Sequence, residues 1–380
     1  MNCPTCGEPG EVVSGRFDGY VEGYRVAIVE CGRCRLRYAD RLDVPETLYE
    51  SIYRHAAVLP GYDRYARYAG AVTRSPEPLD LLAGAELPYR FAADAVRLLP
   101  RDAVVVDLGC GEGYLTYALR RAGYTCLGVD LSQTVVDRAR RRFGHDDWFA
   151  TTAELDLAGA DLVLALEIIE HVPDPVGFLR DAMTYLRPGG SVVVTTPNRD
   201  ASPADAIWDT DLPPVHLLWF GSTAIREVAR RAGCDATFLD APRYGRAPAR
   251  TWQPLLTADG RPSAAVRRVR GLGWRTRNRV CRFLNSGLQQ PFRALPEPAG
   301  KDAPTLGVAF RPQPVEAGAA RSAADGGAAR SAADGGATRS AADGGATRSA
   351  AGAGATRSAA VGAHRSAARS AAPDAGRVSE

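Results

Sequence analysis

The sequence predicts an α/β fold with a mostly parallel sheet, preceded by a small cysteine-rich unit and followed by a low-complexity tail. From residue 86 onward, short apolar segments alternate with helical patterns of about 10–15 residues, which is typical of parallel strands joined by right-handed crossovers. Two C-x-x-C pairs stand near the start of the chain, and a nine-residue repeat stands near its end. These three observations divide the chain into its expected parts.

The chain has the composition of a globular protein. Its 380 residues are 45% hydrophobic and 24% charged, and the formal net charge of +3 gives no case for binding nucleic acid or membranes. Lys301 is the single lysine, which indicates a GC-rich genome rather than a function. The start of the chain shows no basic segment followed by an apolar one, and no apolar run approaches the roughly 18 residues of a membrane span. We therefore expect a cytoplasmic protein.

The first part, residues 1–40, is expected to be a zinc ribbon. Its cysteines form two C-x-x-C pairs, Cys3 with Cys6 and Cys31 with Cys34, separated by 24 residues. Two matched pairs in a small β-rich unit indicate two knuckles that close one tetrahedral four-thiolate zinc site rather than a redox pair. Such a site is structural, because protein ligands fill all four positions of the metal. The role of the ribbon stays open between docking to the substrate domain, dimerisation and nucleic-acid contact.

Residues 41–85 are expected to be helical and to form a linker or a lid. This segment is rich in tyrosine and arginine, and Tyr62, Tyr65 and Tyr68 recur every three residues, which places them on one side of a helix. An aromatic stripe of this kind is commonly a packing surface. Because the segment directly precedes the α/β part, a lid over a substrate is the alternative.

The α/β part, residues 86–312, is expected to be built from alternating elements. Strands are predicted at 103–109, 125–132, 147–151, 160–169, 191–198, 234–240 and 305–312. Helices are predicted at 89–100, 113–123, 133–144, 176–190 and 222–233, and the helix at 176–190 is expected to close with a Pro-Gly-Gly turn. An insertion at about 241–304 separates the last two strands. It carries nine arginines from Arg261 to Arg293 with no acid among them.

The first strand of the α/β part runs into a glycine-rich turn, "DLGCGEG" at residues 107–113. Glycines in a strand-to-helix turn let backbone N–H groups approach a ligand that a Cβ atom would block. The turn does not fit the dinucleotide fingerprint, because Tyr114 stands where that motif has its third glycine. Asp107 precedes the first glycine and favours a cationic or polyhydroxylated ligand over a pyrophosphate. Asp130, at the end of the second strand, is placed to accept both hydroxyls of a ribose.

These residues resemble a known family. D-x-G-x-G-x-G followed about twenty residues later by an acid is similar to the motif of the class I S-adenosylmethionine-dependent methyltransferases. "DLVLALEIIEHVPDP" at 161–175 resembles the family's fourth-strand block, and "YLRPGGSVVVTTPN" at 185–198 its fifth-strand turn and strand. "HLLWFGSTAIREVARRAGC" at 216–234 resembles the branch that contains ubiquinone-biosynthesis O-methyltransferases. The resemblance covers residues 86–240 and 305–312, and implies a Rossmann-like, seven-stranded sheet with S-adenosylmethionine as cofactor.

The resemblance also implies roles for individual residues. The backbone of the glycine turn would flank the methionine moiety of the cofactor, with Asp107 near its ammonium group. Asp130 would hold the ribose, and Glu167 would face the methionine end from the fourth strand. Thr152 stands where the family often has an acid beside the adenine. The complete set expected to bind the cofactor is Asp107, Gly109, Cys110, Gly111, Gly113, Asp130, Leu131, Thr152, Ala153 and Glu167.

Three polar residues are candidates for catalysis. Methyl transfer is an in-line displacement at a sulfonium carbon, and a base near the methyl group would remove the proton of the acceptor. His171 follows the fourth strand at the rim where α/β ligands bind, and its alternative role is to cap the "VPDP" turn. His216, in a loop expected to return to the pocket, is the second candidate base or substrate contact, with a structural role as its alternative. Glu170 is expected to support them.

The expected function is S-adenosylmethionine-dependent methylation, with a hydroxyl of a small molecule, glycan or secondary metabolite as the acceptor. A zinc-ribbon RNA methyltransferase is the alternative, because the arginine-rich insertion offers a phosphate-binding face. A cofactor-binding protein without catalysis is the third. The oligomeric state stays open.

The segment 313–380 is expected to be a disordered tail without a catalytic role. A nine-residue period close to "GAARSAADG" places arginines at positions 321, 330, 339, 348 and 357. The repeat has no aromatic residue and almost nothing larger than alanine to bury, so it cannot offset the entropy lost on ordering. A folded solenoid would need an apolar face in every repeat.

Overall fold

The computed structural model describes residues 1–45, 47–59, 62–154, 158–201, 212–240, 256–263 and 303–313. The chain divides into two units, Met1–Val315 and Glu316–Glu380, and the described residues all lie in the first. Most of the expected arginine-rich insertion, and the expected tail beyond Gln313, lie outside the described residues.

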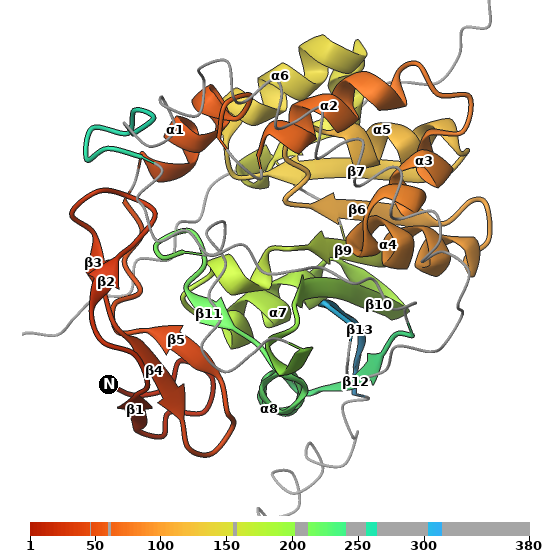
Figure 1. The fold of residues 1–380 in the computed structure, drawn as a ribbon. Helices are drawn as coiled ribbons and strands as arrows, with labels where there is room; N and C mark the ends of the chain where they lie inside the picture. Colours follow the sequence, from red (N-terminus) through yellow and green to blue (C-terminus); the bar gives the residue numbers. More distant parts are fainter. Residues whose placement is uncertain are drawn as a thin grey trace, which may run out of the picture. The chain divides into compact units, whose positions relative to one another are not determined.

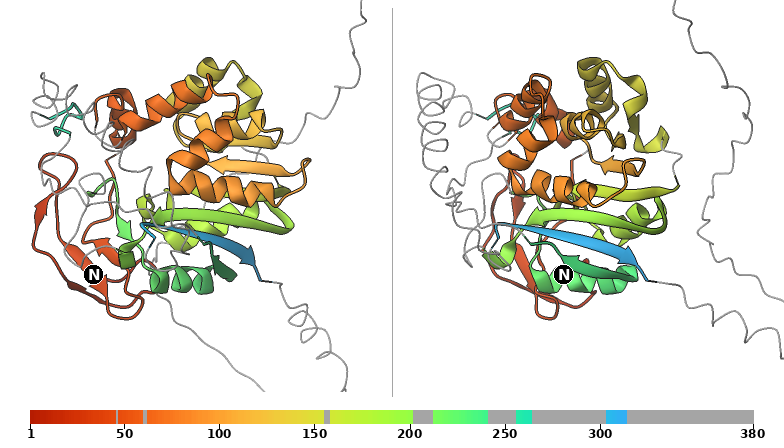
Figure 2. Two further views of the ribbon diagram at one scale, coloured as in Figure 1. Left: turned by 45° about the vertical axis from the view of Figure 1, so that its right-hand side comes forward. Right: turned by 90° about the vertical axis from the view of Figure 1, so that its right-hand side faces the viewer.

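A seven-stranded sheet is the largest element of the first unit (Figure 1), with the strand order β12-β13-β10-β9-β6-β7-β8. Strands β6 to β10 run parallel to one another, whereas β13 is antiparallel to both β10 and β12 and lies along β10 (Figure 2). The strands are β6 Val104–Leu108, β7 Thr125–Asp130, β8 Phe149–Thr151, β9 Ala160–Leu166, β10 Leu186–Pro197, β12 Cys234–Phe238 and β13 Thr305–Pro312. The predicted fold class is confirmed.

Alternate residues of the strands face two different layers of helices. Val105, Leu162 and Val193 pack with α2 to α6 in one hydrophobic cluster. Val106 and Val163 pack with α7 and α8 in another. Because successive strand residues point to opposite faces, a strand covered on both sides needs an unbroken apolar run. The helices are α1 Leu48–His55, α2 Asp63–Val72, α3 Pro78–Ala85, α4 Leu87–Arg97, α5 Tyr114–Arg121, α6 Gln133–Phe143, α7 Pro175–Thr184 and α8 Ser222–Ala232.

The helix expected at 176–190 is shorter in the structure. It ends at Thr184, and the Pro-Gly-Gly segment that we expected to close it belongs to β10. The pairing of β10 with β9 shifts between Leu186, opposite Ala160, and Ser191, opposite Leu162. A Cβ atom at Gly190 would lie 2.8 Å from the carbonyl oxygen of Ala160. This close approach of two backbones, and not a helix end, therefore requires the glycine.

The cysteine-rich part, residues 1–40, forms short strands and shares a sheet with the α/β part; we call it the cysteine unit. A four-stranded sheet has the order β1-β4-β5-β11, and its last strand comes from the segment before α8. Leu218 of β11 pairs with Tyr38 of β5 in antiparallel register. A hairpin of β2 and β3 completes the unit. The strands are β1 Gly10–Val12, β2 Phe17–Asp18, β3 Arg25–Val26, β4 Ile28–Cys31, β5 Arg37–Ala39 and β11 Leu218–Trp219.

Two further features of the described residues bear on the expectations from sequence. Asp174, and not His171, caps α7, since the Asp174 Oδ1 accepts a hydrogen bond of 2.9 Å from the Gly177 N–H.

Among the described helices, none combines the length and apolar character needed to cross a bilayer.

Candidate functional site

A cavity of about 140 Å³ opens at the carboxyl ends of β6 and β9. Strand β6 has β7 on one side and β9 on the other, so the strand order reverses there, and open α/β sheets bind ligands at such points. Of the residues expected to act, the cavity brings together Asp107, Gly109, Cys110, Gly111, Glu167 and His171. Gly113, Asp130, Leu131, Thr152, Ala153, Glu170 and His216 are not among the residues that line it.

The glycine turn needs its three glycines for different reasons. All three have a positive φ, 75° at Gly109, 52° at Gly111 and 74° at Gly113. A Cβ atom at Gly109 would lie 2.5 Å from the side chain of Ile168, and one at Gly113 would lie 2.6 Å from that of Phe149. At Gly111 the nearest atom would be the Tyr53 hydroxyl at 3.8 Å. The outer two glycines therefore permit packing, whereas Gly111 leaves its backbone open toward the cavity.

Asp107 lies at the floor of the cavity and is 3% exposed. The Thr116 hydroxyl donates a hydrogen bond of 2.7 Å to its Oδ2. Burial raises the pKa of Asp107 to about 6, because the charged form loses its hydration, and the hydrogen bond from Thr116 offsets part of this effect. A cation bound in the cavity would stabilise the ionised form.

Asp130 holds the glycine turn in place. Its Oδ2 accepts a hydrogen bond of 3.0 Å from the Gly111 N–H, and its Oδ1 accepts one of 3.0 Å from the Ser132 N–H. Burial raises the pKa of Asp130. A carboxylate has about four lone-pair positions, so both oxygens can still accept a ligand hydroxyl. The next residue, Leu131, is 87% exposed.

Glu167 follows β9 with a positive φ of 56°, which is uncommon for a residue other than glycine and is found often at functional sites. Its backbone N–H donates to the Thr195 carbonyl at 3.0 Å, and its Oε1 accepts a hydrogen bond of 2.9 Å from the Thr195 hydroxyl. Thr195 on β10 thus holds both the backbone and the side-chain carboxylate of Glu167 at the cavity wall.

The side chains of Glu170, His171 and His216 form a second group beside the cavity, which we call the polar cluster. Their ligating atoms all lie within 4.8 Å of one another, so they could hold a metal ion. The two imidazole rings are perpendicular, with centroids 4.6 Å apart. His171 lines the cavity, whereas Glu170 and His216 are buried behind it. The tertiary structure therefore brings all three predicted catalytic residues together, with His171 facing the cavity.

The tautomer of His171 follows from its hydrogen bond. Its Nδ1 lies 2.5 Å from the Val215 carbonyl oxygen, and because a carbonyl can only accept, Nδ1 carries the proton. In the neutral ring, Nε2 is then the basic atom. Its distance to the Glu170 Oε1 is 4.0 Å. Burial lowers the pKa of His216 to about 3, with Arg64 contributing, so His216 is neutral at pH 7.

Sequence reasoning missed four tyrosines of the cavity wall, Tyr49, Tyr53, Tyr89 and Tyr114. The stripe that it did identify is divided in two. Tyr62 and Tyr65 line the cavity, as expected of a lid, whereas Tyr68 packs against Tyr89 and Tyr114, as expected of a packing surface. The high tyrosine content of residues 41–85 was the available signal for Tyr49 and Tyr53, but it could not show which rings face the cavity, and Tyr89 and Tyr114 lie outside that segment.

Glu112, within the glycine turn, was also missed. Its side chain is 4% exposed and forms ion pairs with Arg138 at 2.7 Å and Arg142 at 3.3 Å, both on α6. Arg138 also donates a hydrogen bond of 3.1 Å to the Tyr53 carbonyl. The pair therefore ties α1 to the glycine turn.

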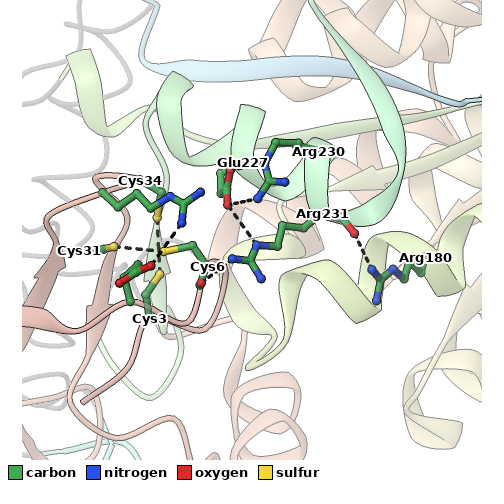
Figure 3. A network of polar contacts seen from close by, with 10 residues as sticks. Cys3, Cys6, Cys31, Cys34, Arg180, Glu227, Arg230 and Arg231 are labelled. Carbon is green, nitrogen blue, oxygen red and sulfur yellow. Dashed lines mark hydrogen bonds and ion pairs between the residues drawn. The ribbon is translucent and has the colours of Figure 1, made fainter.

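The four cysteines of the cysteine unit are buried, and their Sγ atoms lie within 4.8 Å of one another (Figure 3). The Sγ atoms of Cys3 and Cys34 are 3.5 Å apart, and those of Cys6 and Cys31 are 3.4 Å apart. These distances exclude disulfides, whose sulfurs are about 2.05 Å apart, and are close to the roughly 3.8 Å between thiolates bound tetrahedrally at about 2.3 Å from zinc. The donor set therefore fits zinc.

The reversed strand order and the glycine turn between two carboxylates define the domain of a class I methyltransferase. A family model described as a methyltransferase domain matches residues 84–237. The chain is 31% identical, over 202 residues, to an S-adenosylmethionine-dependent methyltransferase of Mycobacterium tuberculosis, covering 49% of this chain and 71% of that protein. It belongs to the class I S-adenosylmethionine-dependent methyltransferase family, which confirms the resemblance inferred from its motifs.

Other relatives match a shorter stretch. The chain is 38% identical over 117 residues to a ubiquinone biosynthesis O-methyltransferase of Parvibaculum lavamentivorans, covering 29% of this chain and 46% of that protein. The chain is 34% identical over 145 residues to a methyltransferase of Mycolicibacterium smegmatis, covering 37% of this chain and 54% of that protein. The chain thus spans about half the length of these two relatives. A solved methyltransferase from Mesorhizobium loti is 19% identical, with 58% of this chain and 97% of that chain covered and a TM-score of 0.36.

Proposed function

We propose that this protein transfers a methyl group from S-adenosylmethionine to a hydroxyl oxygen of a small-molecule, glycan or secondary-metabolite acceptor. The observation that carries the proposal is the shared cavity, which His171 and Glu167 line together with the glycine turn of a methyl-donor domain. The relative from Parvibaculum lavamentivorans is named an O-methyltransferase of ubiquinone biosynthesis, which is consistent with this reaction, whereas the name of the relative from Mycolicibacterium smegmatis states no acceptor.

The proposed mechanism assigns a task to each group. Asp107 pairs with the ammonium of the cofactor, and Asp130 accepts the ribose hydroxyls while it holds Gly111. When bound, S-adenosylmethionine would supply a methyl group on a sulfonium; the acceptor oxygen would bond to the methyl carbon as the carbon–sulfur bond breaks, with the electron pair left on a neutral thioether. The acceptor proton passes to the Nε2 of His171, which the Val215 carbonyl keeps in the basic tautomer.

A second role for the polar cluster is favoured by its geometry. Two imidazoles and a carboxylate with ligating atoms within 4.8 Å are a donor set suited to a divalent transition-metal ion. The bond from the Nδ1 of His171 to a backbone carbonyl is the arrangement by which metal-binding histidines are oriented. A bound cation would lower the pKa of the acceptor hydroxyl, in place of a base.

The acceptor class is tested with cofactor that carries a tritiated methyl group. The protein is incubated with a lysate of its source, and the small-molecule and RNA fractions are counted separately. Label in the small-molecule fraction supports the proposal, whereas label in RNA supports the zinc-ribbon RNA methyltransferase. Cofactor binding without label in either fraction would show a non-catalytic protein. Addition of Mn²⁺ to protein that keeps its four-thiolate zinc then separates base from cation, since a base does not require the added ion.

Cofactor affinity is expected to fall in acid. Asp107 has a pKa of about 6 in the free protein, and its ionised form pairs with the ammonium, so binding below pH 6 must release a proton. Above pH 6 the Kd should be constant, and below it the Kd should rise by about tenfold per pH unit. Calorimetry between pH 5 and pH 8 measures this. Asp107→Asn should bind more weakly with a flatter profile, and an equally steep profile in that variant would contradict the assignment.

A further inference from the structure

The segment of residues 212–219, which we call the bridge segment, lies between the cysteine unit and the polar cluster. On the side of the cysteine unit, the Tyr20 N–H donates a hydrogen bond of 2.6 Å to the Pro213 carbonyl. The Ala39 N–H donates one of 2.9 Å to the Leu217 carbonyl, and β11 continues this pairing along β5. The cysteine unit therefore holds the bridge segment by backbone hydrogen bonds from two of its strand regions.

The same segment is held from the side of the polar cluster. The Leu217 N–H donates a hydrogen bond of 2.9 Å to the Glu170 carbonyl, and the Val215 carbonyl accepts the bond from the His171 Nδ1. His216 lies between these two bonded residues, and its ring stands against that of His171. Leu217 is thus hydrogen-bonded to the cysteine unit through its carbonyl and to Glu170 through its N–H.

The cysteine unit is itself anchored firmly enough to fix a neighbour. Cys6 and Tyr38 belong to one hydrophobic cluster with Phe220 and with apolar residues of α8. Arg231 of α8 donates a hydrogen bond of 2.6 Å to the Cys6 carbonyl, and Glu227 and Arg180 hold Arg231 in turn (Figure 3). A metal bound by the four thiols would lock the knuckle of Cys31 and Cys34, which joins β4 to β5, to the knuckle of Cys3 and Cys6.

From this arrangement we infer that the cysteine unit is a positioning element for the polar cluster, acting through the bridge segment. Its four-thiolate site, when it holds zinc, keeps β5 in register with β11. This register sets the positions of His216, of the Val215 carbonyl that accepts from His171, and of the Leu217 N–H that donates to Glu170. The inference rests on the proposed function, in which the polar cluster acts on the acceptor. It assigns the cysteine unit a role within this chain rather than in RNA contact.

Two glycines of the cysteine unit offer a matched pair of variants. A Cβ atom at Gly19 would lie 2.1 Å from the Pro213 carbonyl oxygen and 3.1 Å from the Tyr24 carbonyl oxygen, so Gly19→Ala must move residue 19 and the bridge segment apart. A Cβ atom at Gly15 would meet nothing within 4 Å, so Gly15→Ala is the control. Neither glycine has a φ in the left-handed region, and neither substitution removes a cysteine. Both variants should therefore retain one zinc per chain.

Hydrogen–deuterium exchange is the first readout. In Gly19→Ala the amides of residues 215–220 should exchange at least about tenfold faster than in the wild type, while β6 and β7 keep their protection. Gly15→Ala should match the wild type. Extraction of zinc from the wild-type protein should loosen the same residues and serves as a second perturbation that needs no substitution. Equal exchange at 215–220 in all proteins, or equal loosening of β6 and β7, would overturn the inference.

Methyl transfer is the second readout. Gly19→Ala should lower kcat at least about fivefold while the Kd for S-adenosylmethionine stays within twofold, because the glycine turn is not touched. A loss of cofactor affinity equal to the loss of kcat would indicate general destabilisation and overturn the inference. The exchange experiment uses no acceptor. A failure of the proposed function therefore appears as absent transfer in the wild type, whereas a failure of the inference appears as unaltered exchange at the bridge segment.

Discussion

His171→Ala is expected to lower kcat for methyl transfer by a factor of about 10² to 10⁴, the usual contribution of a positioned base. The Nε2 of His171 is the basic atom of a ring that lines the cavity, and the Val215 carbonyl fixes its tautomer. The substitution leaves the glycine turn in place, so the Kd for S-adenosylmethionine should change by less than about threefold. Steady-state kinetics on the labelled acceptor, with calorimetry for the cofactor, make the measurement.

His145→Ala provides the control for removing an imidazole. His145 is stacked on Trp148, with ring centroids 3.6 Å apart, and does not line the cavity, so its loss should leave kcat unchanged. Added imidazole should restore part of the rate of His171→Ala if the ring acts as a base. If instead the rate recovers with rising Mn²⁺, the ring is a metal ligand. Retention of more than a third of the wild-type kcat in His171→Ala would show that it is neither.

Cys31→Ser is expected to abolish zinc binding and to lower the melting temperature by more than about 10 °C. Structural zinc sites contribute many kcal/mol to folding, and a domain of this size loses about 2–4 °C for each kcal/mol. The loss should spread beyond the cysteine unit, because Cys31 packs in one hydrophobic cluster with Phe220 and Ile225. Metal analysis should find one zinc per chain in the wild type and none in the variant.

Cys234→Ser is the matched control. Cys234 is also buried, at the start of β12, but it belongs to neither group of described side chains that could hold a metal. This variant should keep its zinc, and the protein should lose only the stability that one buried thiol contributes. Zinc retained at one per chain in Cys31→Ser, or a folded wild type whose four thiols bind no zinc, would disprove the four-thiolate site.

Short-range features could be predicted because their physical causes lie within a few residues. The alternation of apolar strands and helices indicated the seven-stranded sheet, and six of its strands lie within their predicted ranges, whereas β10 begins at Leu186, before its predicted range of 191–198. The glycine turn was identified from its spacing, and the positive φ values at Gly109, Gly111 and Gly113 give the reason for that spacing. The Pro-Gly-Gly segment was interpreted wrongly, because a close approach to β9 and a helix end require the same glycines.

Long-range features could not be predicted. Tyr49 and Tyr53 belong to the cavity because α1 folds over the carboxyl edge of the sheet, and helical periodicity alone does not say what a helix covers. The pairing of Leu218 with Tyr38 adds a strand of the α/β part to the cysteine unit, although the sequence suggests two independent parts. A three-residue strand and a two-residue strand have too little pattern for their pairing to be recognised along the chain.

The sequence by itself determined the residue types on which the chemistry depends: four thiols at knuckle spacing, and a glycine turn between Asp107 and Asp130. Each is a local motif whose backbone conformation and ligand chemistry are set by neighbours along the chain. The tertiary structure alone decided that Glu170, His171 and His216 meet, and that the bridge segment joins them to the cysteine unit. The reason is that hydrogen bonds between strands distant in the sequence, and the packing of α8 against the cysteine unit, depend on the register of the whole fold.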